Sequence, residues 1–181
     1  MKKNRLLNQS ADFWASWSLE RIKAGKMTDL FVPDYVTEIK DYQFAGCEML
    51  ESVVIPEGVV LGDGAFSDCV NLTYVAMSGE NFGSFASAFS GCPIKTVTIS
   101  DGEVRMGSGE GIESGLDGFT DLSTIKLLRK VTGVDVEVLA ALKNLKSIKI
   151  SPNNAVYEEA CDGQGIVERE SRRLIFSLSK L

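Results

Sequence analysis

A spacing rule recurs along most of this chain and constrains its fold more than any other feature. An apolar residue is followed at +3, +6, +9 and +11 by further apolar residues or cysteine, first as Phe44, Cys47, Leu50, Val53 and Ile55. The set Phe66, Cys69, Leu72, Val75 and Met77 repeats the spacing 22 residues later. Self-similarity at a period of this length predicts a repeat protein, in which stacked units share one core.

The register continues through three further copies. The third is one residue shorter, with Ile94 near the leucine position, and consists of Phe89, Cys92, Val97 and Ile99. The fourth restores the full spacing with Leu116, Phe119, Leu122, Ile125 and Leu127. The fifth consists of Leu139, Leu142, Leu145, Ile148 and Ile150. A half-copy, Leu30 and Val32, stands 23 residues before Val53 and Ile55.

The step sizes assign a conformation to each part of the repeat. Steps of three suit a short helical or 3₁₀ turn that faces inward once per turn, and the final step of two is the alternation of a β-strand. One such unit cannot bury its apolar side alone, whereas stacked units bury it against each other. We therefore predict an α/β repeat, a leucine-rich-repeat solenoid of about five to six units with a parallel β-sheet on one face.

Two segments resemble a known family. The run Val36–Pro56 resembles the BspA-type leucine-rich repeat of bacterial proteins, and Ser151–Tyr157 followed by Asp162 and Gly163 resembles the hairpin insertion of that family. The resemblance covers about residues 28–178 and implies a solenoid, with a role like that of surface adhesins or binding proteins. The chain departs from the pattern at its irregular third repeat, at a long insert and where Phe119 and Leu142 replace cysteine.

The predicted domain has three parts. Residues 1–27 form an N-terminal capping helix, residues 28–150 the solenoid, and residues 151–181 a C-terminal hairpin or cap. Ser10 or Asp12 is the expected N-cap of a helix that ends near Gly25. Its tryptophans, Trp14 and Trp17, either cover the open end of the core or form an aromatic patch for a partner.

The C-terminal cap is expected to be a β-hairpin. Ala155–Tyr157 and Gly165–Val167 are the strand candidates, and Asp162 with Gly163 is a favoured tight-turn pair between them. Leu174–Phe176 is a third strand candidate.

Three cysteines occupy one register position. The first three copies have Cys47, Cys69 and Cys92 at this position, and the fourth and fifth copies have Phe119 and Leu142. This set of residues indicates a buried apolar column. A disulfide or a metal site is the alternative, although the chain has no histidine to complete a zinc shell. Cys161, in the predicted hairpin, is the thiol expected to be reactive.

Composition limits the possible functions. The net charge of −6 without a dense basic stripe disfavours nucleic acid, and no apolar run is long enough for membrane insertion. The absence of histidine removes Ser-His and Cys-His catalysis. We expect no enzyme, cofactor or metal, with a hydrolase built on carboxylates or Cys161 as the weakest hypothesis. No signal peptide is visible, so the protein is cytoplasmic if Met1 is native, and secreted or on the cell surface if a signal was removed.

The segment from Asp101 to Gly118 breaks the repeat and contains six glycines. We expect a mobile surface loop, and we hypothesise that it contributes to recognition because loops often carry binding residues.

Strand alternation predicts an outward face of the sheet. One outward row is Phe31, Val54, Ala76, Thr98, Lys126 and Lys149. The neighbouring row is Asp29, Ser52, Tyr74, Thr96, Thr124 and Ser147. The predicted function is a binding or adhesion module that presents this face to a protein or glycan; the alternative is a structural component that assembles through its ends or edge. The candidate partner-binding residues are Phe31, Val54, Tyr74, Lys126 and Lys149.

Overall fold

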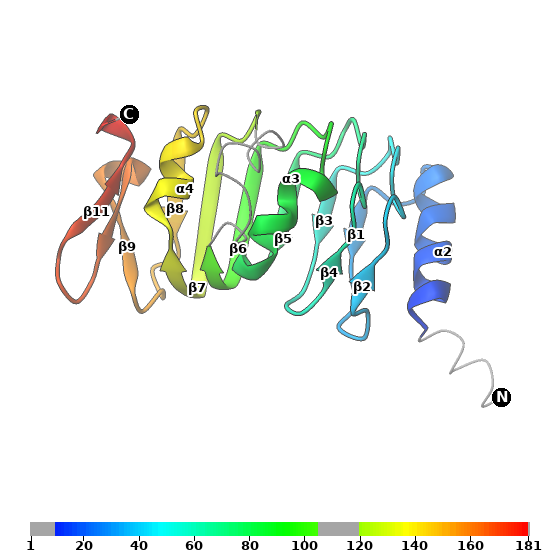
Figure 1. The fold of residues 1–181 in the computed structure, drawn as a ribbon, viewed down its shortest axis with the longest axis horizontal. Coiled ribbons are helices and arrows are strands. Elements are labelled where there is room, and N and C mark those ends of the chain that lie inside the picture. The colour runs from blue at the N-terminus through cyan, green and yellow to red at the C-terminus, as the bar shows by residue number, and fades with distance from the viewer. Residues whose placement is uncertain (1–9, 105–119, 181) are drawn as a thin grey trace.

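The protein is a stack of short coils along one axis, as seen in a computed structural model that describes residues 10–104 and 120–180. A six-stranded parallel sheet runs along one side of the stack (Figure 1). A helix lies at the N-terminal end of the stack and a small antiparallel sheet at the other end. The predicted repeat solenoid with a parallel sheet is therefore confirmed.

The elements of the first half follow in chain order. They are α2 (Ala11–Lys23), β1 (Asp29–Phe31), β2 (Glu38–Ile39), β3 (Ser52–Val54), β4 (Val60–Leu61), β5 (Tyr74–Met77), the 3₁₀ helix η1 (Gly79–Ser84) and α3 (Phe85–Ala88). The second half contains β6 (Thr96–Val104), β7 (Thr124–Val134), α4 (Val136–Ala141), β8 (Ser147–Ile150), β9 (Tyr157–Ala160), η3 (Cys161–Gly163), β10 (Gly165–Glu168), β11 (Leu174–Ser177) and η4 (Leu178–Lys180).

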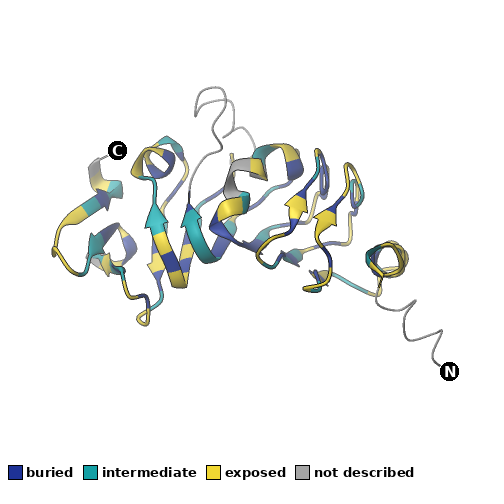
Figure 2. Ribbon diagram, turned by 60° about the horizontal axis from the view of Figure 1, so that its bottom comes forward, coloured by how far each residue is buried: buried dark blue, intermediate teal, exposed yellow. Residues whose placement is uncertain are grey.

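The register of the large sheet follows the repeat. Its strand order is β1-β3-β5-β6-β7-β8, and every neighbouring pair is parallel. One paired row points into the core and is fully buried: Leu30, Val53, Val75, Val97, Ile125 and Ile148. The alternation of buried and exposed residues is visible along the strands in Figure 2. The step of two in the sequence thus fixes which side of each strand is core.

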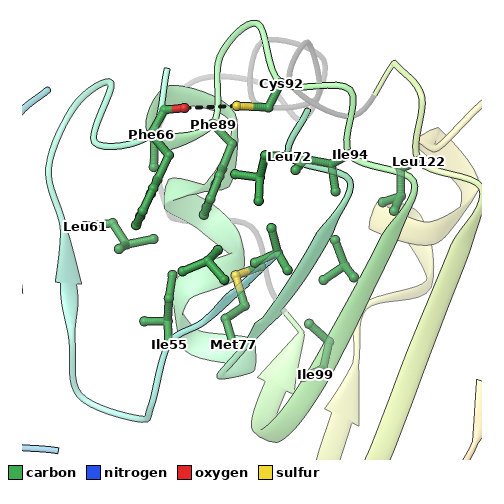
Figure 3. Packing of buried hydrophobic residues seen from close by; sticks show 14 of the residues in the cluster. Ile55, Leu61, Phe66, Leu72, Met77, Phe89, Cys92, Ile94, Ile99 and Leu122 are labelled. Carbon is green, nitrogen blue, oxygen red and sulfur yellow. Dashed lines mark hydrogen bonds between the residues drawn. The ribbon is translucent and has the colours of Figure 1, made fainter. Parts of the chain in front are cut away.

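A column of aromatic rings runs through the first coils. The rings of Phe44 and Phe66 stack with centroids 5.4 Å apart, and those of Phe66 and Phe89 stack at 5.0 Å. Trp14 of α2 meets Phe44 edge-on at 5.6 Å, so the helix joins the same column. Figure 3 shows Phe66 and Phe89 side by side among buried aliphatic residues. In the fourth copy, Leu116 and Phe119 lie outside the described residues.

Backbone hydrogen bonds also join the coils on the side away from the large sheet. The residue before each cysteine takes a positive φ, at Gly46 (66°), Asp68 (57°) and Gly91 (75°). The amide of Gly46 donates to Ser67 O at 2.7 Å, and the amide of Asp68 donates to Ser90 O at 2.8 Å. The repeat therefore pairs its coils at two places, through the strands and through these turns.

The C-terminal sheet has the order β11-β10-β9 and is antiparallel. Its first strand begins at Tyr157, two residues later than the predicted Ala155. The cause is Asn154, whose side-chain oxygen accepts hydrogen bonds from the amides of Val156 (2.9 Å) and Tyr157 (2.7 Å) and so shapes a turn there. Asp162 and Gly163 both take positive φ, and they lie in η3 within the four-residue connection from Ala160 to Gly165 rather than in a two-residue tight turn.

The expected insert loop is partly wrong. Residues 101–104 belong to β6, which continues past the repeat and pairs with Lys130–Val134 of β7. Val104 and Val131 are fully buried and hold the two long strands against the core, although the register shifts twice along the extension. The remainder of the expected loop, residues 105–118, lies outside the described residues.

Candidate functional site

The outer face of the six-stranded sheet carries the predicted row of side chains in the predicted register. Phe31 pairs with Val54, Val54 with Ala76, and the row continues to Thr98, Lys126 and Lys149. Phe31 is 66% exposed at the edge strand, Val54 is half-buried, and both lysines are exposed. The structure therefore brings all five candidate residues, including Tyr74 from the neighbouring row, onto one face.

The middle of this row is not exposed. Ala76 and Thr98 are buried, in contrast to the predicted outward row. The hydroxyl of Tyr74 donates a hydrogen bond to Thr98 Oγ1 at 3.0 Å. The tyrosine side chain therefore extends diagonally from β5 to β6, beside Ala76, which is paired with Thr98. Tyr74 is thus a half-buried ridge in the centre of the face, and alternation alone could not reveal a side chain that covers its neighbours.

The second row is polar and mostly half-buried. Asp29 accepts a 2.5 Å hydrogen bond from Ser52 Oγ, which ties the first two strands together at the surface. Thr96, Thr124 and Ser147 continue the row with small hydroxyl groups. This side of the face offers hydrogen-bonding groups but little relief.

The charges around the face separate into two sets. An acidic half surrounds β1, β3 and β5, and its exposed residues are Asp29, Asp34, Glu51, Glu57 and Glu80. These three strands, the residue before each and the three residues after each contain no lysine or arginine. A basic half surrounds β6, β7 and β8, and its exposed basic residues are Lys95, Lys126, Arg129, Lys130, Lys146 and Lys149; the acidic residues within these three strands are the half-buried Asp101 and Glu103 of β6.

Sequence reasoning missed this separation. It considered only the residues inside the strands, whereas Glu51 and Lys146 directly precede strands and Asp34 and Glu57 follow them. A comparison of the residues at the same distance before or after each predicted strand would have shown the separation of charges.

The two lysines of the candidate set lie opposite each other on neighbouring strands. Lys149 Nζ lies 3.6 Å from Glu159 Oε2 of β9, and both partners are partly exposed. Lys126 forms no ion pair within residues 10–104 and 120–180. Like charges in direct cross-strand positions are unfavourable, and the contact with Glu159 offsets this repulsion for Lys149.

The helix α2 presents a second aromatic surface. Ser10 is its N-cap and accepts a hydrogen bond from the amide of Phe13 at 3.1 Å. Trp14 is 7% exposed, whereas Trp17 is 44% exposed and carries the guanidinium of Arg21 at 4.9 Å from its ring centre. The expectation that both tryptophans cover the core is therefore wrong for Trp17. A shallow hollow of about 390 Å³ is lined by Phe13, Trp14, Trp17 and Tyr35.

The cysteine column is buried and its thiols are free. The Sγ of Cys69 donates to Phe44 O at 3.2 Å, and the Sγ of Cys92 donates to Phe66 O at 3.0 Å (Figure 3). The hydrogen bond with Cys69, followed by burial, raises the pKa of Cys47. The hydrogen bond with Cys47 lowers the pKa of Cys69, but the bond with Cys92 and burial outweigh it and raise this pKa to about 12. The thiols of Cys47 and Cys69 are protonated at neutral pH.

Among the described residues, no cluster of three or more His, Cys, Asp or Glu side chains is arranged to hold a metal ion. No helix in the same part of the chain is long and apolar enough to cross a membrane.

Comparisons with known proteins agree with the repeat geometry. Residues 23–109 match a family described as "BspA type Leucine rich repeat region (6 copies)". No curated protein matches the chain.

Three solved structures are similar in fold. A leucine-rich cell surface protein from Faecalibacterium prausnitzii A2-165 is 23% identical, with 69% of this chain and 32% of that chain covered and a TM-score of 0.45. A leucine-rich repeat protein from Eubacterium ventriosum ATCC 27560 is 16% identical, with 83% and 40% covered and a TM-score of 0.42. The pneumococcal vaccine antigen PcpA is 15% identical, with 82% and 36% covered and a TM-score of 0.38.

The aligned part of this chain thus spans about a third to two fifths of the length of those structures. The recurring spacing, the stacked parallel strands and the matched region agree: the chain carries BspA-type leucine-rich repeats, which the family matches over residues 23–109.

Proposed function

We propose that the protein is a non-enzymatic binding module whose partner-binding surface is the outer face of the six-stranded sheet. The observation that carries the proposal is Phe31, a phenylalanine 66% exposed on the edge strand and paired with the apolar Val54. A large exposed aromatic group beside a half-buried valine gains free energy when a partner covers it. Tyr74 extends this apolar area toward the centre of the face.

A protein partner suits this face better than a glycan. The face is shallow, its apolar end lies within the acidic half defined above, and the basic half follows on the other side of Tyr74. Complementary charge around an apolar centre is the usual arrangement of protein–protein interfaces, where it raises association rates and selects the partner. The partner in this proposal is therefore a protein with its own patches of opposite sign.

The same proposal assigns roles to the two ends of the chain. Residues 1–27 and 151–181 are the end caps of one domain, and residues 28–150 are the binding solenoid between them. The contacts of Trp14 with Phe44 and of Asn154 with β7 support these roles. Caps of this kind keep the open ends of a solenoid soluble.

A matched pair of variants tests the binding face. The triple variant Phe31→Ser, Val54→Ser and Tyr74→Ser removes its apolar residues. The control Tyr42→Ser, Val60→Ser and Val70→Ser removes three exposed apolar residues that lie outside the six-stranded sheet.

The measurement is affinity capture from bacterial and host lysates with quantitative mass spectrometry, alongside a glycan array. We expect the face variant to lose at least about tenfold of the captured protein and the control to keep it, since two or three buried apolar anchors are worth several kcal/mol. The proposal is overturned if both variants retain the same proteins, or if only the array detects a ligand. Thermal melts of both variants verify that each is folded.

A further inference from the structure

The separated charges of the sheet face are self-complementary. The strands form six positions in the order β1-β3-β5-β6-β7-β8, with the acidic half on the first three and the basic half on the last three. We propose that a second copy of this chain covers the face, related to the first by a two-fold axis that runs parallel to the strands between β5 and β6. The inference rests on the proposed binding face and names its occupant.

This axis is selected by the charges. It places β1 of one copy over β8 of the other, β3 over β7, and β5 over β6, so that each acidic half faces a basic half. A two-fold axis along the stack would instead place β1 over β1 and β8 over β8, and like charges would meet along the whole face. Closed dimers of this isologous kind need a surface that matches itself, which this one does.

Both ends of the strands satisfy the same symmetry. Under this axis β3 of one copy faces β7 of the other. Glu51, which precedes β3, therefore lies near Lys146, which precedes the neighbouring β8 of the other copy. At the strand ends, Asp34 and Glu57 lie on the side that carries Arg129 in the other copy. A rotation about the strand direction places strand beginnings over strand beginnings and strand ends over strand ends. Acidic and basic residues therefore face each other at both ends of the strands.

The apolar and aromatic groups also find partners under this axis. Phe31 on β1 of one copy meets the end that bears Lys149 on β8 of the other, and a lysine over an aromatic face contributes about 0.5–1 kcal/mol at an exposed site. Val54 on β3 meets β7, where Lys126 offers an aliphatic stem. Tyr74 lies next to the axis and packs against the hydroxyl-bearing β6.

The size of the face sets the expected strength. Six strands at a spacing of about 4.8 Å span roughly 24 Å, and strands of this length cover about 10–15 Å in the other direction. Two such faces bury well below about 1,200 Å² in total, which is the range of weak and transient contacts. The dimer is therefore expected to be reversible, with dissociation at micromolar concentration or above, and sensitive to salt.

The first measurement is sedimentation velocity across a concentration series at low and high salt. We expect a reversible monomer–dimer equilibrium that weakens at least about tenfold between about 0.02 M and 0.5 M NaCl, because the Debye length shortens over this range. A monomer at all concentrations overturns the inference. A continuous series of larger oligomers overturns it as well, since it indicates open end-to-end contacts.

Two charge-reversal variants give the decisive test. The first, Glu51→Lys with Glu57→Lys, changes the summed charge of the five acidic residues of the acidic half from −5 to −1; the second, Lys126→Glu with Arg129→Glu, changes that of the six basic residues of the basic half from +6 to +2. These four side chains form no hydrogen bond or ion pair with other described residues, so folding is expected to be retained. Each variant alone should be monomeric, and an equimolar mixture should form a one-to-one heterodimer.

The outcomes separate this inference from the proposed function. If the mixture fails to associate while the apolar face variant still loses a captured partner, the face binds another protein and only the self-association is wrong. If the mixture fails to associate and the apolar variant loses nothing, both are wrong. A wild-type dimer that persists in both charge variants also overturns the inference, because the sheet face is then not the contact.

Discussion

The first and second halves of the solenoid solve the same stacking problem with different residues. From Phe44 to Cys92 the coils place identical side chains above one another, and the rings of Phe44, Phe66 and Phe89 stack within 8° of parallel. From β6 to β8, aliphatic residues fill the described core positions, and β6 and β7 extend to nine and eleven residues. The rings stack although the two coils that separate them are 22 and 23 residues long, so the column tolerates a difference of one residue.

The surface follows the same division. The acidic half lies over the coils with the aromatic column, and the basic half lies over the long strands and β8. The two halves therefore differ inside and outside at the same boundary, between β5 and β6. Variants that act on one half and spare the other test whether this boundary has energetic meaning.

The largest effect is expected in the aromatic column. Phe66→Ala removes a fully buried ring that stacks on both neighbours, and should lower the free energy of unfolding by about 3–5 kcal/mol. Chemical denaturation followed by circular dichroism gives this value. The variant for comparison in the second half is Leu145→Ala, which occupies the repeat position of Leu72 and is 7% exposed.

Leu145→Ala should cost about 2 kcal/mol, the low end of the range for buried leucine, because its site borders solvent. Equal losses in the two variants would contradict the view that the stacked rings hold the first half together more strongly than aliphatic packing holds the second.

The helix at the N-terminal end offers the next comparison. Trp14→Ala should cost about 3 kcal/mol, since Trp14 is buried against Phe44. Trp17→Ala should cost less than about 1 kcal/mol, because its ring is 44% exposed and its contact with Arg21 is a surface one. Thermal melts of the single variants decide between them. If Trp17→Ala proves as destabilising as Trp14→Ala, the helix packs differently from the arrangement described here.

In the second half, the corresponding structural residue is polar. The side chain of Asn154 is buried and donates to Leu128 O (2.8 Å) and Val131 O (3.0 Å) of β7, while it accepts from two amides of its own turn. Asn154→Ala should destabilise the protein by about 2 kcal/mol, because these backbone groups lose their partner.

The exposed Asn153 is the control for this variant, and Asn153→Ala should change the free energy of unfolding by less than about 0.5 kcal/mol. Hydrogen exchange can then locate the effect of Asn154→Ala. Faster exchange confined to β7 and β9 is expected, and uniform acceleration through the aromatic column would argue against a local role.

The sequence was most informative where one residue type recurs at one offset. The spacing of Phe44, Phe66 and Phe89 predicted both the register and the buried side of every strand, because each step size has a single regular conformation. The row that contains Phe31 and Lys149 followed from the same alternation. Its register was correct for all six strands.

The features that could not be predicted depend on side-chain reach and on chain extension. Nothing in the spacing shows that Tyr74 lies across Ala76 and Thr98, or that Asn154 ends one strand and delays the next. The continuation of β6 through Asp101–Val104 was not predicted, because Gly102 suggested a loop. In the structure Gly102 lies within the strand, with φ of 70°, at a point where the register shifts. Such irregularities arise from tertiary contacts and leave no periodic trace.

The smallest effect is expected in the cysteine column, which marks the first half and is replaced by Leu142 in the second. Cys69→Ala removes one sulfur and its weak hydrogen bond to Phe44 O, and should cost about 1 kcal/mol at pH 7. The folded pKa of about 12 lies above the unfolded value of about 8.5, so the thiol stabilises the fold fully below pH 8.5. That stabilisation is lost as the pH rises toward 12.

The advantage of wild type over Cys69→Ala in free energy of unfolding should therefore fall by about 2 kcal/mol between pH 7 and pH 10 and change sign, because only the wild type loses free energy as this thiol ionises on unfolding. Urea titrations at the two pH values measure it. A difference that stays constant would mean that the pKa of Cys69 in the folded protein equals that of an unfolded thiol. A gap that widens would mean that its thiolate is stabilised in the fold, which would reopen the reactive or metal-binding reading of the column.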